Sequence, residues 1–235
     1  ERFYKRAQDI LSEYDDAEAE ARGLDHEPVG LLRISCVSSM ARLVIGPRIA
    51  SFMKMYPHIR VDVLTDDSYT DLVEEGVDLA IRIGKLVDSS LMAKKVGEAP
   101  AALWASPEYL AARGTPAHPR HLAEHDAVMF RQTASTEWTL YRGDETVNVK
   151  VDGRFKASSG DLLLQAAQNG LGVFLTAAWL VSDCVNDGSL VRILPEWTAT
   201  PSPIHCVWTS GKLRGKAKLF ADHIADALQF ETPAC

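Results

Sequence analysis

Strand-like and helix-like segments alternate along this chain, and this alternation constrains its fold more than any other feature. Apolar or alternating runs typical of strands take turns with runs at helical spacing, over residues 31–37, 41–56, 59–63, 69–75 and 78–83. Parallel neighbours in a sheet need a crossover, which is usually a helix. The order strand, helix, strand, helix, strand therefore predicts a parallel sheet covered by helices.

The second half of the chain repeats this logic after an interruption by shorter segments. Strands are expected over residues 91–96, 101–105, 127–130, 138–141, 146–155, 172–175 and 190–194, and helices over 106–111, 161–169 and 177–185. Ser106 and Pro107 are typical of the cap and the first position of a helix. A last strand over 204–209 and an amphipathic helix over 216–230 are expected to return to the first half. The sequence thus predicts an α/β chain with two halves.

The first 23 residues predict a helix of another kind. Apolar side chains recur at alternating steps of four and three residues, as in the seam of a coiled coil: Phe3, Ala7, Ile10, Tyr14, Ala17 and Ala21. Such a seam favours pairing with a partner helix, and a surface helix lying on its own domain remains the alternative. No capping residue precedes Phe3, so we expect the helix to continue into a segment before Glu1.

The charge of the chain argues against nucleic-acid binding by these residues alone. The net charge is -7, whereas a phosphate-binding face needs a surplus of Lys and Arg. No apolar run is long enough to predict a membrane span, and the charged start does not resemble a signal peptide. The cysteines, Cys36, Cys184, Cys206 and Cys235, are scattered, as expected for free thiols in a reducing compartment. We therefore expect a soluble, cytoplasmic protein.

Each half carries a serine pair where a strand meets a helix. Ser38 and Ser39 follow the strand that ends near Val37, and Ser158 and Ser159 follow a strand in the second half. A helix N-terminus offers free backbone N–H groups and the positive end of its dipole, so it favours anions. In open α/β sheets, ligands bind beyond the carboxyl ends of the strands, and two such halves would enclose a cleft. The alternative is that these serines only cap their helices.

Longer motifs occur in a fixed order along the chain. They are Phe-Tyr-Lys-Arg-Ala at 3–7, Gly-Leu-Leu-Arg-Ile-Ser at 30–35, Asp-Leu-Val-Glu-Glu-Gly-Val-Asp-Leu-Ala-Ile-Arg-Ile-Gly at 71–84, Ala-Ser-Pro-Glu-Tyr-Leu at 105–110 and Gly-Ser-Leu-Val at 188–191. The stretch at 71–84 is the most specific, and none of the motifs is a catalytic signature. With these motifs the chain resembles, over nearly its whole length, the LysR-type transcriptional regulators without their N-terminal winged helix-turn-helix.

The resemblance implies two Rossmann-like subdomains joined by crossover strands, similar to type 2 periplasmic binding proteins and preceded by a dimerisation linker helix. Residues 1–23 would form the linker helix, residues 30–100 and 206–230 effector-binding subdomain I, and residues 101–205 effector-binding subdomain II. The resemblance also implies a homodimer or homotetramer that binds promoter DNA through the N-terminal domain and responds to a small, often anionic effector. RNA polymerase is a further candidate partner, and no cofactor is implied.

The effector positions of the family fall on residues near the expected strand ends. The resemblance implies an effector site made of Ser38, Ser39, Asp66, Ser68, Arg82, Gly84, Phe130, Arg131, Ser158 and Thr176, with Trp208 as a weaker candidate. Thr176 and Ala177 stand where many members have a proline, so the site departs from the family pattern there. Tyr69 is added as a residue that would stack on an aromatic effector, whereas Trp138 and Trp197 are expected in the core.

Two arginines are the expected counter-charges for a carboxylate effector. Arg82 and Arg131 each carry a guanidinium, which can bind a carboxylate through two parallel hydrogen bonds. Arg82 lies in an apolar strand, and an ion pair with Asp62 or Asp78 explains it equally well.

Other functions have weaker support. A secreted solute-binding protein of a transporter would share the two-lobed fold, but it has no use for a coiled-coil helix. His118, His121 and His125 are close in sequence, yet no cysteine or carboxylate cluster completes a metal site. Ser51 and Lys54 match a Ser-x-x-Lys pattern without the Lys-Thr-Gly that should follow, so an enzyme is not expected.

Overall fold

A computed structural model describes residues 28–67, 72–86, 90–131, 136–209 and 211–230. The helix expected over residues 1–23 lies outside these residues. The chain divides into two compact units, unit 1 with Glu1–Gly97 and Ile204–Gln229, and unit 2 with Glu98–Pro203 and Phe230–Cys235. The boundaries between the subdomains are expected after residues 100 and 205, whereas the contacts divide the chain after residues 97 and 203.

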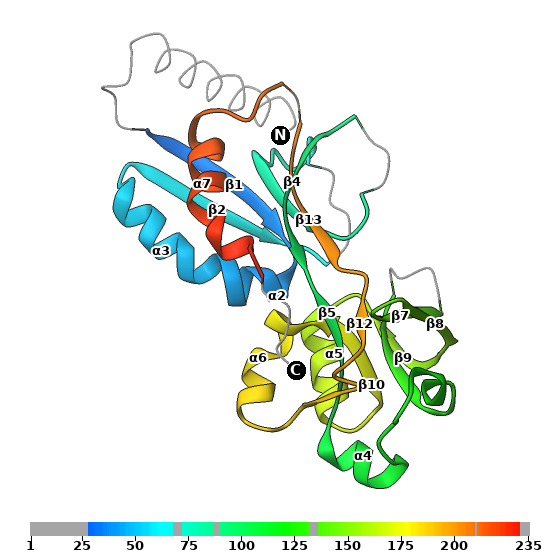
Figure 1. The fold of residues 1–235 in the computed structure, drawn as a ribbon. Coiled ribbons are helices and arrows are strands. Elements are labelled where there is room, and N and C mark those ends of the chain that lie inside the picture. Colours follow the sequence, from blue (N-terminus) through cyan, green and yellow to red (C-terminus); the bar gives the residue numbers. More distant parts are fainter. Residues whose placement is uncertain (1–27, 68–71, 87–89, 132–135, 210, 231–235) are drawn as a thin grey trace. The chain divides into compact units, whose positions relative to one another are not determined.

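Unit 1 contains one five-stranded sheet (Figure 1). Its strands are β1 (Gly30–Cys36), β2 (Ile59–Thr65), β3 (Leu79–Ile83), β4 (Met92–Ala99) and β13 (Ser202–Trp208), in the order β2-β1-β3-β13-β4. β1 pairs in parallel with both β2 and β3, and β13 pairs antiparallel to β3. The parallel core that the alternation of strands and helices predicts is therefore confirmed, and the returning strand reverses the direction at one side.

One long helical run covers a face of this sheet. It consists of α2 (Ser38–Met40), the π-helical turn η1 (Ala41–Ile45) and α3 (Gly46–Met55), so it starts before the expected position 41. Helix α7 (Gly215–Ile224) and the short turn η3 (Asp226–Leu228) follow β13. The rings of Phe52 on α3 and Phe220 on α7 meet edge to face at 5.0 Å, and both side chains are fully buried. These aromatic side chains tie the two helices to one core.

Two expected helices differ from the structure. The short helix expected over 69–75 lies partly outside the described residues, and its described part, 72–75, forms turns. The helix expected over 216–230 is regular only to Ile224. Gly76 with its positive φ of 64° closes the first of these segments, as the sequence pattern predicts.

Unit 2 contains a five-stranded sheet in the order β11-β5-β10-β6-β9 and a three-stranded sheet in the order β12-β7-β8. Its elements are β5 (Ala101–Ala105), α4 (Pro107–Arg113), η2 (Pro119–Glu124), β6 (Asp126–Phe130), β7 (Glu137–Arg142), β8 (Glu145–Lys150), β9 (Asp152–Ala157), α5 (Gly160–Gln168), β10 (Val173–Ala177), α6 (Ala178–Asn186), β11 (Val191–Ile193) and β12 (Thr198–Ala199). β6, β9 and β10 run parallel, and β5 runs antiparallel to β10.

Local sequence signals explain most of these boundaries. Ser106 caps α4 as expected, because its Oγ accepts a hydrogen bond from the Tyr109 backbone N at 3.2 Å. The single strand expected over 146–155 is wrong: Val151 separates β8 from β9, which belong to different sheets. The Val151 N–H donates to the Thr136 carbonyl, and its buried side chain anchors the change of sheet.

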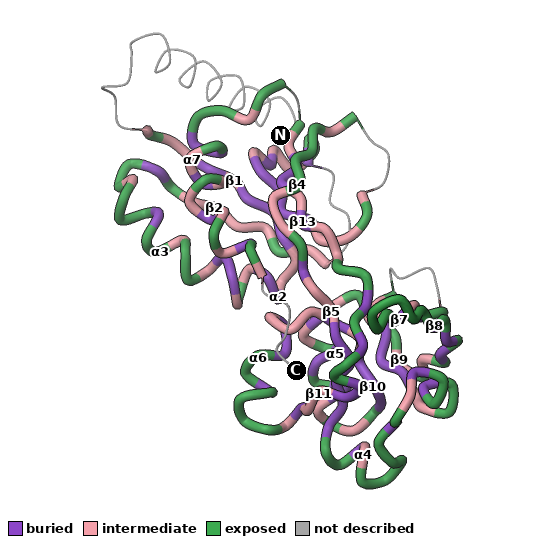
Figure 2. The backbone as a smooth tube through the Cα atoms, viewed as in Figure 1, coloured by how far each residue is buried: buried purple, intermediate pink, exposed green. Residues whose placement is uncertain are grey.

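The core of unit 2 lies between its two sheets and the short helices. Strands β5 and β10 are largely buried, as Figure 2 shows. Trp138 and Trp197 belong to this core, which confirms the expectation that they pack rather than bind. Among the described residues, no helix is both long enough and apolar enough to cross a lipid bilayer.

Candidate functional site

The expected site residues of unit 1 follow the carboxyl ends of three parallel strands. Ser38 and Ser39 follow β1, Asp66 follows β2, and Arg82 and Gly84 stand at the end of β3. Two hydrogen bonds hold the loops together: the Ser38 backbone N donates to the side-chain Oδ1 of Asp67 at 3.0 Å, and the Asp66 backbone N donates to the Cys36 carbonyl at 3.1 Å. The structure thus gathers Ser38, Ser39, Asp66, Arg82 and Gly84 along one margin of the sheet, which we call the unit 1 edge.

Arg82 is the buried cation of the unit 1 edge. Only 8% of this residue is exposed, and its Nη2 donates to Ser35 Oγ at 2.9 Å. The aspartates considered as its partners both contact Arg33, whose Nε donates to Asp62 Oδ2 at 3.4 Å and whose backbone N donates to Asp78 Oδ2 at 2.8 Å. Burying a guanidinium is costly unless anionic or hydrogen-bonding groups surround it. The unit 1 edge thus holds the buried guanidinium of Arg82 together with the carboxylate of Asp66.

The two serine pairs differ in what their hydroxyl groups do. Ser159 caps α5, because its Oγ accepts from the Leu162 N at 3.4 Å. The N-cap of α2 is Val37, and no side chain caps this helix. Capping thus accounts for Ser159 but leaves the hydroxyls of Ser38 and Ser39 outside that role. Both serines lie directly before the π-helical turn η1, a type of irregularity that is frequent at functional sites.

Unit 2 has an equivalent margin, which we call the unit 2 edge: Phe130, Arg131, Ser158 and Thr176. β6, β9 and β10 end there side by side, and Phe130 stands opposite Ala157 in the register. The Arg131 N donates to the Ala157 carbonyl at 2.8 Å, while the residue itself is exposed. Thr176 is buried, and its carbonyl accepts from Trp104 Nε1 at 3.1 Å. The unit 2 edge thus combines an exposed cation with an aromatic ring.

One expected residue does not join either edge, and two cannot be placed. Ser68 and Tyr69 lie outside the described residues. Trp208 lies at the opposite margin of the sheet, because antiparallel β13 pairs Ile204 with Ile83 and Val207 with Ala80. Its Nε1 donates to the Gly211 carbonyl at 2.9 Å. The direction of β13 therefore separates Trp208 from the carboxyl ends of the parallel strands.

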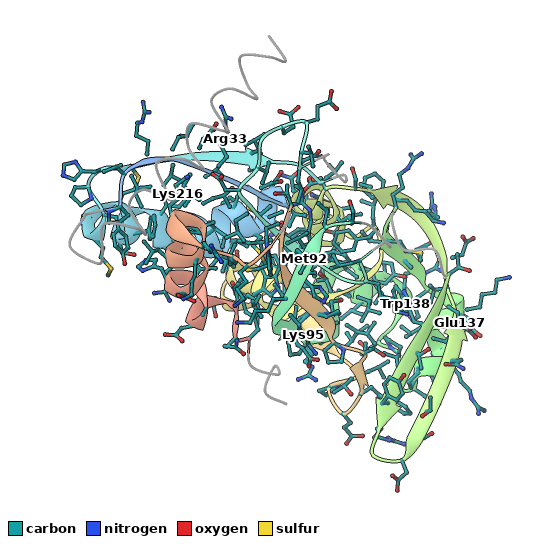
Figure 3. All side chains as sticks on the ribbon, turned by 90° about the horizontal axis from the view of Figure 1, so that it is seen from above. Arg33, Met92, Lys95, Glu137, Trp138 and Lys216 are labelled. Atoms are coloured by element: carbon teal, nitrogen blue, oxygen red, sulfur yellow. The ribbon has the colours of Figure 1, made fainter. Side chains whose placement is uncertain are left out.

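The same register brings in a residue that sequence reasoning missed. His205 stands directly opposite Arg82, and its Nδ1 is buried without a hydrogen-bond partner among the described residues. Burial lowers the pKa of His205 below its usual value, and the positive charge of Lys95 lowers it further. Figure 3 labels Lys95 on β4, the strand next to β13. His205 lies within the strand expected over 204–209, but only the direction of pairing reveals that it is the residue opposite Arg82.

Acid is expected to destabilise the protein through His205. Because its folded-state pKa lies below the unfolded value of 6.5, the unfolded chain binds more protons between the two values. The free energy of unfolding should be constant above pH 6.5 as far as this group is concerned, and should fall as the pH drops from there toward the folded-state pKa. Burial and the charge of Arg113 also lower the pKa of His125. This group should therefore add to the same fall in stability with decreasing pH.

Urea unfolding at about pH 7.5, 6.5 and 5.5 would measure this slope, with His205→Gln as the variant. The variant should lose less stability on acidification than the original protein. An unchanged slope would mean that His205 does not titrate as its surroundings indicate.

Burial or hydrogen bonding within the fold accounts for two described thiols, Cys36 and Cys206, and two histidines, His118 and His125. Cys36 and Cys206 are buried free thiols, and burial raises the pKa of each to about 11. His118 Nδ1 accepts from the Arg120 N at 3.2 Å, and His125 Nδ1 contacts the Tyr109 hydroxyl at 3.1 Å. No group of three metal-binding side chains occurs in the described part of the chain.

One serine and one histidine meet as a catalytic pair would. Ser51 Oγ lies 2.9 Å from His223 Nε2, but it also lies 2.9 Å from the Arg48 carbonyl, to which it donates its proton. A hydroxyl that gives its proton to a carbonyl can only accept from the imidazole, which is the reverse of general-base activation. This contact joins α3 to α7 and supplies no nucleophile.

Comparison with known proteins identifies the family. The model of the LysR substrate binding domain matches residues 25–229. The HTH-type transcriptional regulator CrgA of Neisseria meningitidis is 32% identical over 228 residues, which are 96% of this chain and 76% of that protein. The HTH-type transcriptional activator TtdR of Escherichia coli K12 is 32% identical over 199 residues, 84% of this chain and 64% of that protein.

Solved structures agree with these sequence matches. The CrgA structure has a TM-score of 0.75 at 31% identity and covers 96% of this chain and 78% of that one. Full-length AphB from Vibrio cholerae has a TM-score of 0.71 at 30% identity, with coverage of 96% and 78%. The relatives are transcriptional regulators and not enzymes, and the alternative of a transporter's solute-binding protein is not favoured. The chain therefore belongs to the LysR-type transcriptional regulators and contains their substrate-binding domain, with its two Rossmann-like subdomains.

Proposed function

We propose that this chain is the effector-sensing and oligomerising part of its regulator, and that the effector is a small carboxylate held by the unit 1 and unit 2 edges. The observation that carries the proposal is the buried guanidinium of Arg82 beside two serines that do not cap their helix. DNA binding would belong to an N-terminal winged helix-turn-helix, since the net charge of these residues is -7.

A carboxylate fits the donors of the unit 1 edge better than a neutral or cationic ligand does. A guanidinium binds the two carboxylate oxygens through parallel hydrogen bonds, and nearby hydroxyls donate to the same oxygens. The N-terminus of the helical run that starts at Ser38 adds a partial positive charge. His205 Nδ1, which is buried opposite Arg82, could donate a further hydrogen bond.

The unit 2 edge would contribute the other part of the site. Arg131 is exposed at the end of β6, and the ring of Phe130 lies 5.7 Å from that of Phe174. This pairing of a cation with an aromatic surface suits a carboxylate that carries an apolar body. Ser68, which the family pattern assigns to the same site, and Tyr69, which would stack on an aromatic effector, remain part of the proposal.

The response to the effector would be a shift between conformations. A ligand moves such an equilibrium only by its difference in affinity for the two states. An effector that contacts both units favours the conformation in which both sets of contacts are made. In a homodimer or homotetramer paired through the helix expected over residues 1–23, that shift would change the spacing of the DNA-reading helices, which bind half-sites set by the symmetry of the protein. RNA polymerase would be a partner of the promoter-bound form.

Binding measurements with a panel of small carboxylates and their neutral amides test this proposal. Ser39→Ala and Arg131→Ala should each weaken the best carboxylate, by about 3-fold to 10-fold for the hydroxyl and about 10-fold or more for the charge. Ser159→Ala is the matched control, since it removes a cap and should lower stability by about 1 kcal/mol without changing affinity. If both Ser39→Ala and Arg131→Ala bound the carboxylate as tightly as the original protein does, the assignment of the site would be contradicted.

A further inference from the structure

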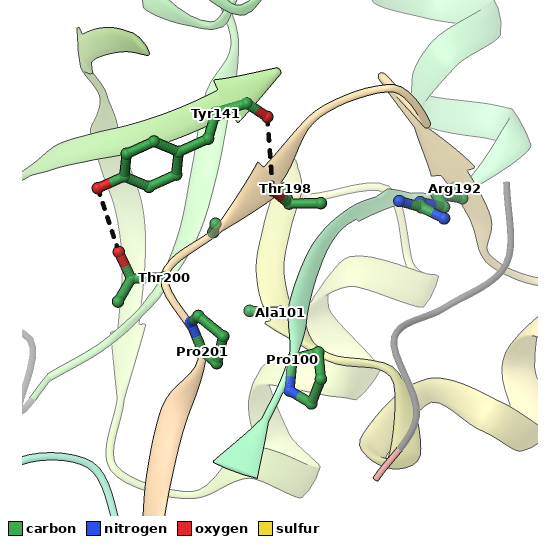
Figure 4. Close-up of a pocket in the computed structure, with 8 residues that line it drawn as sticks. Pro100, Ala101, Tyr141, Arg192, Thr198, Thr200 and Pro201 are labelled. Atoms are coloured by element: carbon green, nitrogen blue, oxygen red, sulfur yellow. Dashed lines mark hydrogen bonds between the residues drawn. The ribbon is translucent and has the colours of Figure 1, made fainter. Parts of the chain in front are cut away.

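Unit 2 contains a pocket that shares no residue with the unit 2 edge (Figure 4). Its volume is about 300 Å³. Four small or rigid apolar residues form its walls, Pro100, Ala101, Ala199 and Pro201. A volume near the lower limit for ligand sites suits a molecule with a single ring or a short chain.

The other four residues that line the pocket carry polar side chains, Tyr141, Arg192, Thr198 and Thr200. Arg192 from β11 brings a guanidinium, whose Nη2 donates to the Pro195 carbonyl at 2.9 Å. This bond fixes the orientation of the group beside the pocket. A cation at one side of apolar walls selects a ligand with an anionic head and an apolar body.

Hydroxyl groups on the other side of the pocket are only loosely engaged. The Tyr141 hydroxyl lies 3.4 Å from Thr200 Oγ1, and Thr198 Oγ1 donates to the Tyr141 carbonyl at 3.4 Å. Figure 4 shows both contacts at the margin of the pocket. These distances exceed those of strong O–H···O hydrogen bonds, so the hydroxyls can turn toward a ligand at low cost.

We propose that this pocket is a second binding site, which takes a small, flat, apolar monocarboxylate with its carboxylate toward Arg192. Walls of proline and alanine leave room for a ring and offer it no competing polar group. The binding itself is independent of the proposed effector site.

The position of the pocket in the chain gives the site a regulatory role. Pro100 and Pro201 belong to the two segments by which the chain enters and leaves unit 2, which spans Glu98–Pro203. A ligand in the pocket contacts both segments at once. Its occupancy would therefore favour the conformations of these connections that keep the pocket intact. This regulatory role rests on the proposed function, in which the two units respond to an effector together.

Titration of the full chain with 4-fluorobenzoate, followed by the fluorine NMR signal, tests the site, with 4-fluorobenzamide as the neutral counterpart. The titrations use Ser39→Ala/Arg131→Ala as the background, so that binding at the edges is suppressed. We expect saturable binding of 4-fluorobenzoate with a Kd on the order of 1 mM. Arg192→Gln should weaken the benzoate by about 10-fold and leave the amide nearly unchanged.

A second variant distinguishes the effect of filling the pocket from the effect of removing the Arg192 charge. Ala101→Leu adds three carbon atoms to the wall, and it should weaken both the benzoate and the amide. Tyr141→Phe, which keeps the ring and removes the hydroxyl, should produce a smaller loss for the benzoate alone. Near-ultraviolet circular dichroism of each variant shows whether its fold is kept, and Ala101→Leu carries the test if Arg192→Gln does not fold.

Two results would overturn the proposal: no saturable binding up to about 20 mM benzoate, or the same affinity in Arg192→Gln and Ala101→Leu as in the background. Neither result touches the effector site, whose test depends on Ser39 and Arg131.

Discussion

Replacing Phe52 with alanine is expected to lower the free energy of unfolding by about 3–5 kcal/mol, the usual range for a large aromatic side chain removed from a core. Phe52 is fully buried, and its ring meets those of Tyr56 at 4.9 Å, Phe220 at 5.0 Å and His223 at 5.5 Å. The substitution removes all three contacts and leaves a cavity between α3 and α7. Because these helices enclose the core of unit 1, the loss should fall on that unit.

The neighbouring residue on the same helix is the matched control. Met53 is 41% exposed, so Met53→Ala should change the free energy of unfolding by less than about 1 kcal/mol. Urea unfolding, followed by circular dichroism and by tryptophan fluorescence, measures both variants. Trp208 is the one tryptophan of the described residues in unit 1, and the other four lie in unit 2, so a loss confined to unit 1 should change the circular dichroism more than the fluorescence. Equal losses in Phe52→Ala and Met53→Ala would show that the aromatic cluster does not carry the core.

Replacing Gly172 with alanine is expected to lower the free energy of unfolding by about 2–5 kcal/mol, from overpacking and backbone strain together. A Cβ at this position would lie 2.3 Å from the Asp126 carbonyl oxygen and 2.8 Å from its carbon. The backbone at Gly172 also has φ of +156°, which side-chain-bearing residues rarely adopt. The added methyl group would therefore push β10 away from β6, its parallel neighbour.

Gly143 separates the two causes. Its φ is +55° in the turn between β7 and β8, and a Cβ there meets nothing within 4 Å. Gly143→Ala should thus cost only the strain of a left-handed residue, about 1–2 kcal/mol. Thermal or urea unfolding of both variants gives the difference. If Gly172→Ala and Gly143→Ala lowered the free energy of unfolding equally, the close approach of Gly172 to Asp126 would not contribute to the loss.

Local pattern predicted the elements of this fold well, because period and caps depend on nearby residues. The apolar runs that became β1 and β3 and the Ser106–Pro107 helix start are encoded within a few positions. The strand expected over 146–155 failed for a different reason. Its alternation continues through Val151, and only the tertiary pairing assigns one part to each sheet.

The candidate site depended more on pairing than on pattern. The residues after β1, β2 and β3 meet at one margin because parallel strands share a direction, which the alternation of strands and helices already implies. The direction of β13 has no such local signal. It separates Trp208 from the site and brings His205 opposite Arg82. The serine pairs likewise look equivalent in sequence, and only the backbone geometry distinguishes the cap Ser159 from Ser38 and Ser39.

The interrupted course of unit 1 has a consequence for the order of folding. β3 ends at Ile83 and its partner β13 begins at Ser202, so the main part of unit 2 lies between two strands that must pair. The entropy of closing that loop opposes the pairing until β13 is in place. Unit 2 is continuous from Glu98 to Pro203 and can form its contacts without waiting for unit 1.

A folded unit 2 removes most of that entropic barrier. Pro100 and Pro201 line the same pocket, so the folded unit holds its two ends close together and delivers β13 to the sheet already near β4. We therefore expect unit 2 to fold before the sheet of unit 1 is completed. A substitution that slows the folding of unit 2 should then also delay unit 1, even where the finished unit 1 is unaffected by it.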